Sequence, residues 1–107
     1  EGQDVCFVKF LAPLLMDSSG KSILLIDDDS NIRLGLKTLL QRNGYQVAAE
    51  ADGQAAIIAI TERAFDLVIM DVFLPHMNGR DCIHAMKESR PELPVIILTG
   101  NPESAVA

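Results

Sequence analysis

The sequence predicts an α/β fold in which helices cover both faces of a parallel sheet. Two observations carry this prediction. Strand-like and helix-like patterns alternate along residues 22–107, and residues 23–26 (Ile-Leu-Leu-Ile) and 67–70 (Leu-Val-Ile-Met) are apolar throughout. A strand with no polar face is buried on both sides, which is typical of a parallel sheet between two helical layers. With 107 residues, the chain is long enough for one domain with a single core.

The elements follow a polar break at residues 17–20. The expected strands are Ser22–Asp27, Tyr45–Ala49, Phe65–Asp71 and Pro94–Thr99. The expected helices run from a cap at Ser30 to Gly44, from Gly53 to Arg63, from Arg80 to Ser89, and from Pro102 onward. Pro75 and the pair Asn78-Gly79 predict a structured loop between the third strand and the third helix.

Composition and charge argue against several classes of function. The net charge is −6 at pH 7, whereas a nucleic-acid surface needs clustered Lys and Arg. The longest apolar stretch, residues 5–16, is interrupted by a lysine and a proline and is shorter than the roughly 20 residues of a membrane span. Acidic residues precede it where a signal peptide has basic ones, so we expect a cytoplasmic protein. Cys6 and Cys82 lack a metal-binding or redox spacing and are expected to be free, buried thiols.

Carboxylates follow two of the apolar strands at the point where each strand ends. Asp27, Asp28 and Asp29 come after the first strand, and Asp71 closes the third. Buried strands seldom end in clustered acids, because ionised carboxylates repel one another and lose hydration. If the two strands are parallel and adjacent, their acids meet at the edge where α/β sheets bind ligands. Mg²⁺ takes carboxylates, waters and phosphate oxygens as ligands, so the sequence predicts a magnesium site there.

Three segments together resemble a known family. Residues 26–29 are Ile-Asp-Asp-Asp, residues 70–79 are Met-Asp-Val-Phe-Leu-Pro-His-Met-Asn-Gly, and residues 94–100 are Pro-Val-Ile-Ile-Leu-Thr-Gly. In this order and spacing, they make residues 21–107 closely resemble the receiver domain of bacterial two-component response regulators. The resemblance implies a flavodoxin-like sheet with strand order 2-1-3-4-5. It also implies a signalling switch that accepts a phosphoryl group from a histidine kinase or a histidine phosphotransfer protein, and that is not an enzyme acting on a metabolite.

The resemblance implies a role for each matching residue. Asp71 matches the phosphorylated aspartate. Asp28 matches the acid that binds Mg²⁺ directly, and Asp27 matches the acid that acts through a bound water. Phe73 matches the position whose backbone carbonyl binds the metal, and Thr99 matches the hydroxyl residue that contacts the phosphoryl group.

The chemistry of these residue types agrees with that assignment. A carboxylate can attack phosphorus while a metal ion neutralises charge on the transferring oxygens. Asp71 must be ionised to attack, so the metal has to offset the repulsion from Asp27 and Asp28. Asp29 is expected at or near the cap of the following helix, where the helix dipole favours an anion.

The N-terminal residues resemble the family's fifth strand, out of its usual order. Residues 1–10 place Lys9 where the family has a lysine after that strand, although Phe10 replaces the proline that normally follows. A circular permutation, a strand exchanged between the chains of a homodimer, the tail of a preceding receiver and an unrelated leader all stay open. We expect one domain with a fifth-strand-like segment at 1–16, a linker at 17–21, and the remaining strands and helices at 22–107.

Two other functions stay open at this level. Asp27 and Asp29 fit the D-x-D signature of haloacid-dehalogenase-like phosphatases, with Asp27 as nucleophile, but that family's later lysine and acidic pair do not follow Thr99. A receiver-shaped interaction module that is never phosphorylated would share the fold, although the intact set of acids argues against it. No DNA-binding helix-turn-helix pattern is present, so an output domain would lie outside these residues. His76 and His84 are expected on the surface.

Overall fold

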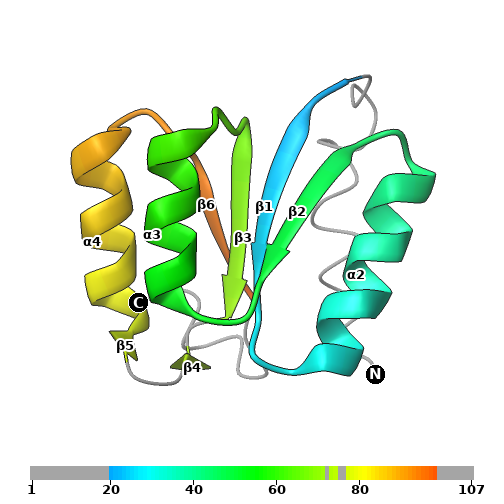
Figure 1. Cartoon of the computed structure of the whole chain (residues 1–107), viewed down its shortest axis with the longest axis horizontal. Helices are drawn as coiled ribbons and strands as arrows, with labels where there is room; N and C mark the ends of the chain where they lie inside the picture. The colour runs from blue at the N-terminus through cyan, green and yellow to red at the C-terminus, as the bar shows by residue number, and fades with distance from the viewer. Residues whose placement is uncertain (1–19, 72, 75–76, 99–107) are drawn as a thin grey trace.

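A four-stranded parallel sheet lies between two layers of helices in the computed structural model, which describes residues 20–71, 73–74 and 77–98 (Figure 1). The sheet contains β1 (Ser22–Ile26), β2 (Gln46–Glu50), β3 (Leu67–Asp71) and β6 (Val95–Leu98). The helices are α2 (Ser30–Arg42), α3 (Gly53–Glu62) and α4 (Gly79–Ser89). The strand order is β2-β1-β3-β6, and all three neighbouring pairs are parallel. The predicted fold class is confirmed, and so is the order of its first four strands.

The two central strands are apolar throughout because each of their faces packs against helices. Successive side chains of a strand point to opposite faces. One set packs with α3 and α4 and includes Leu24, Ile26, Val68 and Met70. The other set packs toward α2 and includes Ile23, Leu25, Leu67 and Ile69. All eight side chains are buried, so the core explains the sequence pattern that predicted these strands.

The ends of α2 are set by its caps. Asp29, which was expected at or near the cap, is the N-cap, and the prediction of Ser30 as the cap was wrong. The Oδ1 of Asp29 accepts hydrogen bonds from the backbone N–H groups of Asn31 at 2.9 Å and Ile32 at 3.1 Å. Ser30 is the first helical residue instead. Asp29 is the better cap because its carboxylate accepts hydrogen bonds from two of the backbone N–H groups that have no acceptor within the helix. At the other end, Gly44 has φ of +94°, a left-handed conformation that glycine adopts without a steric penalty.

The loop predicted after β3 contains a short antiparallel hairpin. It consists of β4 (Phe73–Leu74) and β5 (Met77–Asn78). The Asn78 side chain then caps α4 by accepting a hydrogen bond from the N–H of Arg80 at 2.7 Å. The hairpin therefore leads directly from the carboxyl end of β3 into the next helix.

The first residue of α3 makes a close contact with this hairpin and with α4. A Cβ added at Gly53 would lie 2.9 Å from Sδ of Met77 and 3.1 Å from Sγ of Cys82. Cys82 is a free, buried thiol, as predicted. Burial, with a smaller contribution from the charge of Asp52, raises its pKa to about 11. The thiol therefore stays protonated at neutral pH and serves as packing.

Several sequence predictions fall outside the described residues. Cys6, Lys9, His76 and Thr99 lie there, as do residues 1–16, so the placement of the fifth-strand-like segment stays a prediction. His84 is described and is exposed on α4, as expected. Within the described ranges, no helix combines the length and apolar character needed to cross a membrane.

Candidate functional site

The register of β1 against β3 brings the predicted acids to one edge of the sheet. Ile26 pairs with Met70, so Asp27 and Asp71 follow at the same level on neighbouring strands. Asp28 is the next residue in the chain. One carboxylate oxygen from each of the three acids lies within 4.8 Å of the other two. Residues that are 43 positions apart in the sequence, such as Asp28 and Asp71 (71 − 28), thus form one compact cluster.

The three acids differ in their exposure to solvent. Asp27 is 1% exposed, Asp71 is half-buried and Asp28 is exposed. Burial is the main reason that the pKa of the Asp27 carboxyl is raised above its ordinary value. The backbone N–H of Asp29, which donates to Asp27 Oδ1 at 2.9 Å, acts in the opposite direction, and the charges of Asp71, Asp28 and Asp29 raise the pKa further.

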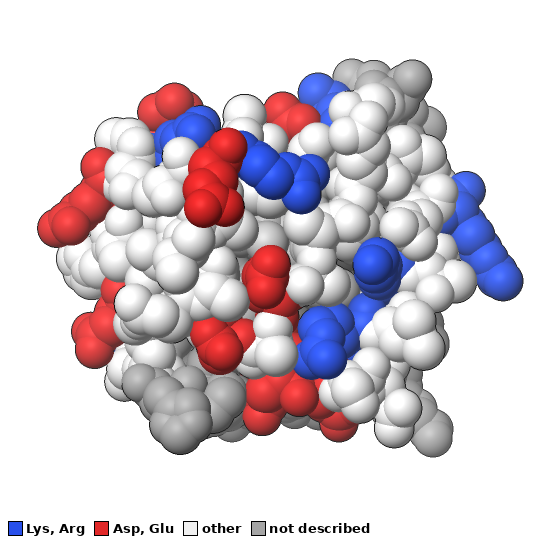
Figure 2. Space-filling model, in the orientation of Figure 1, with Lys and Arg blue, Asp and Glu red and all other residues white. Residues whose placement is uncertain are grey.

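These donors fit a hard divalent cation. Mg²⁺ binds oxygen ligands and needs only one or two carboxylates besides waters and phosphate oxygens. A cation among the three acids would also offset the mutual repulsion that raises the pKa of Asp27. Acidic atoms gather at the lower edge of the molecule in Figure 2, toward which the arrowheads of β1 and β3 point in Figure 1.

The remaining predicted site residues are only partly placed. Phe73 lies in β4, two residues beyond Asp71, and its side chain is not described. Leu98, at the end of β6, pairs with Asp71. Thr99 is the next residue in the chain after Leu98, but Thr99 and Lys9 lie outside the described residues.

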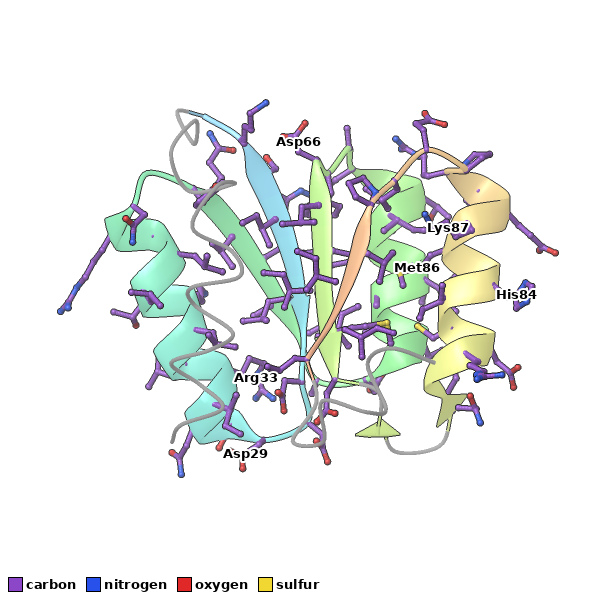
Figure 3. All side chains as sticks on the ribbon, turned by 180° about the vertical axis from the view of Figure 1, so that it is seen from behind. Asp29, Arg33, Asp66, His84, Met86 and Lys87 are labelled. Carbon is purple, nitrogen blue, oxygen red and sulfur yellow. The ribbon has the colours of Figure 1, made fainter. Side chains whose placement is uncertain are left out.

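Sequence reasoning missed one residue at this edge, Arg33. Its Nη1 donates a hydrogen bond to the backbone carbonyl oxygen of Asp27 at 2.6 Å. Figure 3 shows the Arg33 side chain extending from α2 toward the carboxyl end of the strands. A basic residue in the first turn of a helix, directly after an acidic loop, is the signal that could have identified it.

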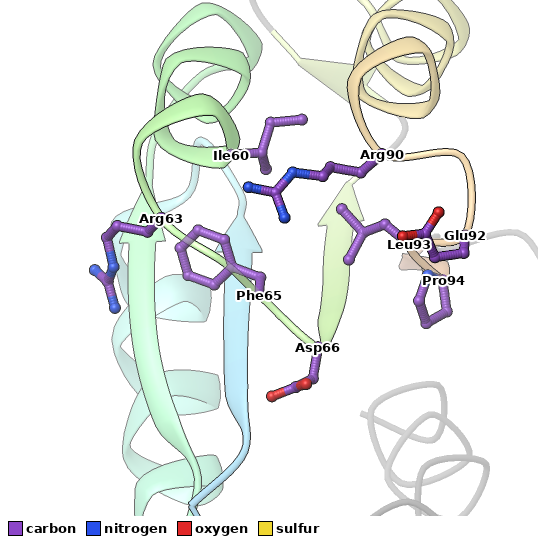
Figure 4. A pocket seen from close by; sticks show the side chains of 8 residues that line it. All are labelled: Ile60, Arg63, Phe65, Asp66, Arg90, Glu92, Leu93 and Pro94. Carbon is purple, nitrogen blue, oxygen red and sulfur yellow. The ribbon is translucent and has the colours of Figure 1, made fainter.

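A separate hollow of about 200 Å³ lies at the opposite end of the sheet (Figure 4). The ends of α3 and α4 and the segments that lead into β3 and β6 form its walls. Arg63, which lies 4.9 Å from the centroid of the Phe65 ring, lines the hollow together with Arg90, Asp66 and Glu92. Because it borders the amino ends of β3 and β6, the hollow is not part of the acidic cluster.

The fold and the cluster define a class: doubly wound α/β domains with an acidic cation site at the carboxyl edge of the sheet. Comparisons with known proteins narrow the class. The sequence model of one protein family, the response regulator receiver domain, matches residues 23–107. The chemotaxis protein CheY of Thermotoga maritima is 34% identical over 88 residues, which are 81% of this chain and 73% of that protein.

Two further similar proteins are also response regulators. The probable transcriptional regulatory protein TcrX of Mycobacterium tuberculosis is 32% identical over 84 residues, covering 78% of this chain and 36% of TcrX. The crystal structure of the response regulator TrrA of Thermotoga maritima, in complex with Mg²⁺ and BeF, superimposes with a TM-score of 0.75 at 30% identity. The similarity covers 80% of this chain and 75% of TrrA.

The chain belongs to the family of response regulator receiver domains. Its function is therefore that of a phosphoacceptor signalling switch in a two-component system, and the phosphatase and unphosphorylated-module alternatives are not favoured. The chain spans about a third of the length of TcrX and about three quarters of the chemotaxis protein.

Proposed function

We propose that Asp71 accepts the phosphoryl group and that Asp27 and Asp28 hold the Mg²⁺ ion needed for its transfer. The meeting of their three carboxylates within 4.8 Å is the observation that supports this proposal. When bound, the metal would neutralise charge on the transferring oxygens. Phe73, through its backbone carbonyl, and Thr99 and Lys9, through their side chains, complete the proposed site by the family resemblance.

The surroundings of the three acids suit different roles. Asp71 closes β3 and is half-buried, so its carboxylate combines a fixed position with access from solvent. Asp28 is exposed and can bind a cation directly. Asp27 is buried and its Oδ1 already accepts the N–H of Asp29, which suits a contact through water.

The proposed reaction is a single group transfer. An Asp71 carboxylate oxygen attacks phosphorus of a phosphohistidine, the O–P bond forms and the P–N bond breaks. The imidazole leaves with the electron pair of that bond and takes up a proton. Water later attacks the phosphorus of the acyl phosphate, and the bond between phosphorus and the Asp71 oxygen breaks. This step releases inorganic phosphate and restores the carboxylate of Asp71.

The same proposal names the partners by their chemistry. A histidine kinase or a histidine phosphotransfer protein is the phosphoryl donor, and any output domain would lie outside residues 1–107. The net charge of −6 disfavours direct nucleic-acid binding by this segment. A cytoplasmic location and a homodimer are further parts of the proposal.

Intact-mass measurement after incubation with acetyl phosphate and Mg²⁺ tests the assignment. The wild type should gain the mass of one phosphoryl group, and Asp71→Asn should not. Asp29→Asn is the matched control, because asparagine caps a helix about as well as aspartate and Asp29 lies outside the proposed ligand set. Phosphate uptake by Asp71→Asn at the wild-type rate would refute the proposal.

A further inference from the structure

We infer that Arg33 is a positioning residue of the metal site, which holds the loop carrying Asp28 in the geometry that binds the cation. This inference rests on the proposed role of Asp27 and Asp28 in binding Mg²⁺. It assigns a function to a residue that contacts neither the phosphoryl group nor the metal in that proposal.

Arg33 bonds to both sides of the acidic loop. Its Nη1 donates to the carbonyl oxygen of Asp27 at 2.6 Å. Its backbone N–H donates to the carbonyl oxygen of Asp29 at 2.9 Å. The first bond belongs to the arginine side chain, whereas the second is the first backbone hydrogen bond of α2, which any residue except proline would make at position 33. Asp28 lies between these two positions, so the side chain of Arg33 restrains the backbone before Asp28 and the start of the helix restrains the backbone after it.

Two other hydrogen bonds hold the loop at Asp27 and Asp29, and neither is made by Asp28 itself. The backbone N–H of Asp27 donates to the carbonyl oxygen of Glu50 at 3.1 Å, and its Oδ1 accepts the N–H of Asp29 at 2.9 Å. Among the described residues, none donates a hydrogen bond to the Asp28 carboxylate, which is exposed. The position of Asp28 at this edge is therefore set by the backbone on either side of it, to which the Arg33 side chain contributes the hydrogen bond at Asp27.

Arginine is well suited to this task. The Arg33 side chain is half-buried, and a guanidinium remains charged and donates through a rigid planar group. Charge-assisted hydrogen bonds are short and stronger than neutral ones. A lysine would keep the charge but would lose the planar group.

The charge of Arg33 and its positioning role have opposite effects on metal binding. A positive charge close to the acids disfavours a second cation, so its removal alone would strengthen Mg²⁺ binding. Removal of a group that orients metal ligands weakens binding, by about 10–100-fold for outer-shell partners. The sign of the change in affinity therefore distinguishes the two effects.

The test is a Mg²⁺ titration of the ¹⁵N-labelled full chain, followed by amide chemical shifts, on the wild type, Arg33→Met, Arg33→Lys and Arg42→Met. Arg42, in the last turn of the same helix, is exposed and provides the matched loss of one charge. We expect Arg33→Met to bind Mg²⁺ at least about tenfold more weakly, Arg33→Lys to bind with intermediate affinity, and Arg42→Met to match the wild type. Unchanged or tighter binding by both Arg33 variants would overturn the inference.

A metal-free measurement provides a second readout. Hydrogen exchange of the Asp29 amide, which donates to Asp27 Oδ1, should be faster in both Arg33 variants than in the wild type in the presence of EDTA. If Arg33→Met does not fold, Arg33→Lys carries both measurements. Absence of Mg²⁺ binding by the wild type would overturn this inference together with the metal role. Mg²⁺ binding without phosphorylation of Asp71 would overturn the phosphoacceptor assignment alone.

Discussion

Asp27 and Asp71 stand at the same level on neighbouring parallel strands, because each directly follows a member of the Ile26–Met70 pair. Asp27 is buried, and its pKa is raised by burial and by the nearby acids, Asp71 among them. The sheet therefore holds two carboxylates where their repulsion is poorly screened by water. A cation bound at this edge of the sheet would offset the repulsion between the Asp27 and Asp71 carboxylates. The first two predictions below depend on that repulsion.

Mg²⁺ should stabilise the folded domain, and Asp28→Ala should remove most of that effect. A ligand that binds only the folded state stabilises it by about 1.4 kcal/mol at ten times its Kd. For a domain of this size, that corresponds to a rise in Tm of roughly 5–10 °C. Thermal melts with Mg²⁺ or with EDTA provide the measurement. An equal Mg²⁺ response in Asp28→Ala and the wild type would place the cation elsewhere.

Asp27→Asn should raise the Tm at neutral pH in EDTA. Because the folded-state pKa of Asp27 is raised above 3.8, protonation of this group favours the folded state. That contribution is present below pH 3.8 and is lost as the pH rises through the folded-state pKa. Asparagine keeps an oxygen for the N–H of Asp29 and removes the charge. Its advantage over the wild type should therefore shrink in melts at acidic pH, and a lower Tm at neutral pH would contradict the prediction.

Gly53→Ala and Gly35→Ala should change stability in opposite directions. At Gly53 the new methyl group would meet Met77 and Cys82 at 2.9 and 3.1 Å, and overpacking costs about 1–3 kcal/mol. At Gly35, inside α2, nothing lies within 4 Å of the added Cβ, so the better helix propensity of alanine should stabilise by about 1 kcal/mol. Urea unfolding measures both. In a Met77→Ala/Cys82→Ala background, which removes both contacting sulfur atoms, Gly53→Ala should cost less stability than in the wild type. An equal cost in the two backgrounds would contradict the steric explanation.

If residues 1–10 contain a permuted or exchanged fifth strand, their deletion should lower the Tm and promote association between molecules. Within the described residues, β6 pairs only with β3, and its four side chains are half-buried. An uncovered strand edge favours pairing between molecules. Thermal melts and light scattering of the deleted chain provide the measurement, with Lys9→Ala as a variant that should still fold. An unchanged Tm together with an unchanged scattering mass would identify residues 1–10 as an unrelated leader.

The sequence by itself determined the sheet and the position of its acids. Residues 23–26 and 67–70 are apolar throughout, as is typical of a strand that is covered on both faces. Asp27, Asp28 and Asp71 follow those strands directly, and parallel strands end at the same edge. The pattern of apolar residues along the chain and the parallel direction of the strands were enough to place these acids together.

Only the tertiary structure decided how the acids differ and what holds them. Asp27 is buried while Asp28 beside it is exposed, because the chain leaves the sheet between them. Arg33 reaches the carbonyl of Asp27, and Gly53 meets Met77 and Cys82, because α2, α3 and α4 pack at particular positions on the sheet. Such contacts depend on how side chains of different elements lie against one another in three dimensions. Neither the apolar periodicity nor the turn residues of a sequence predict that arrangement.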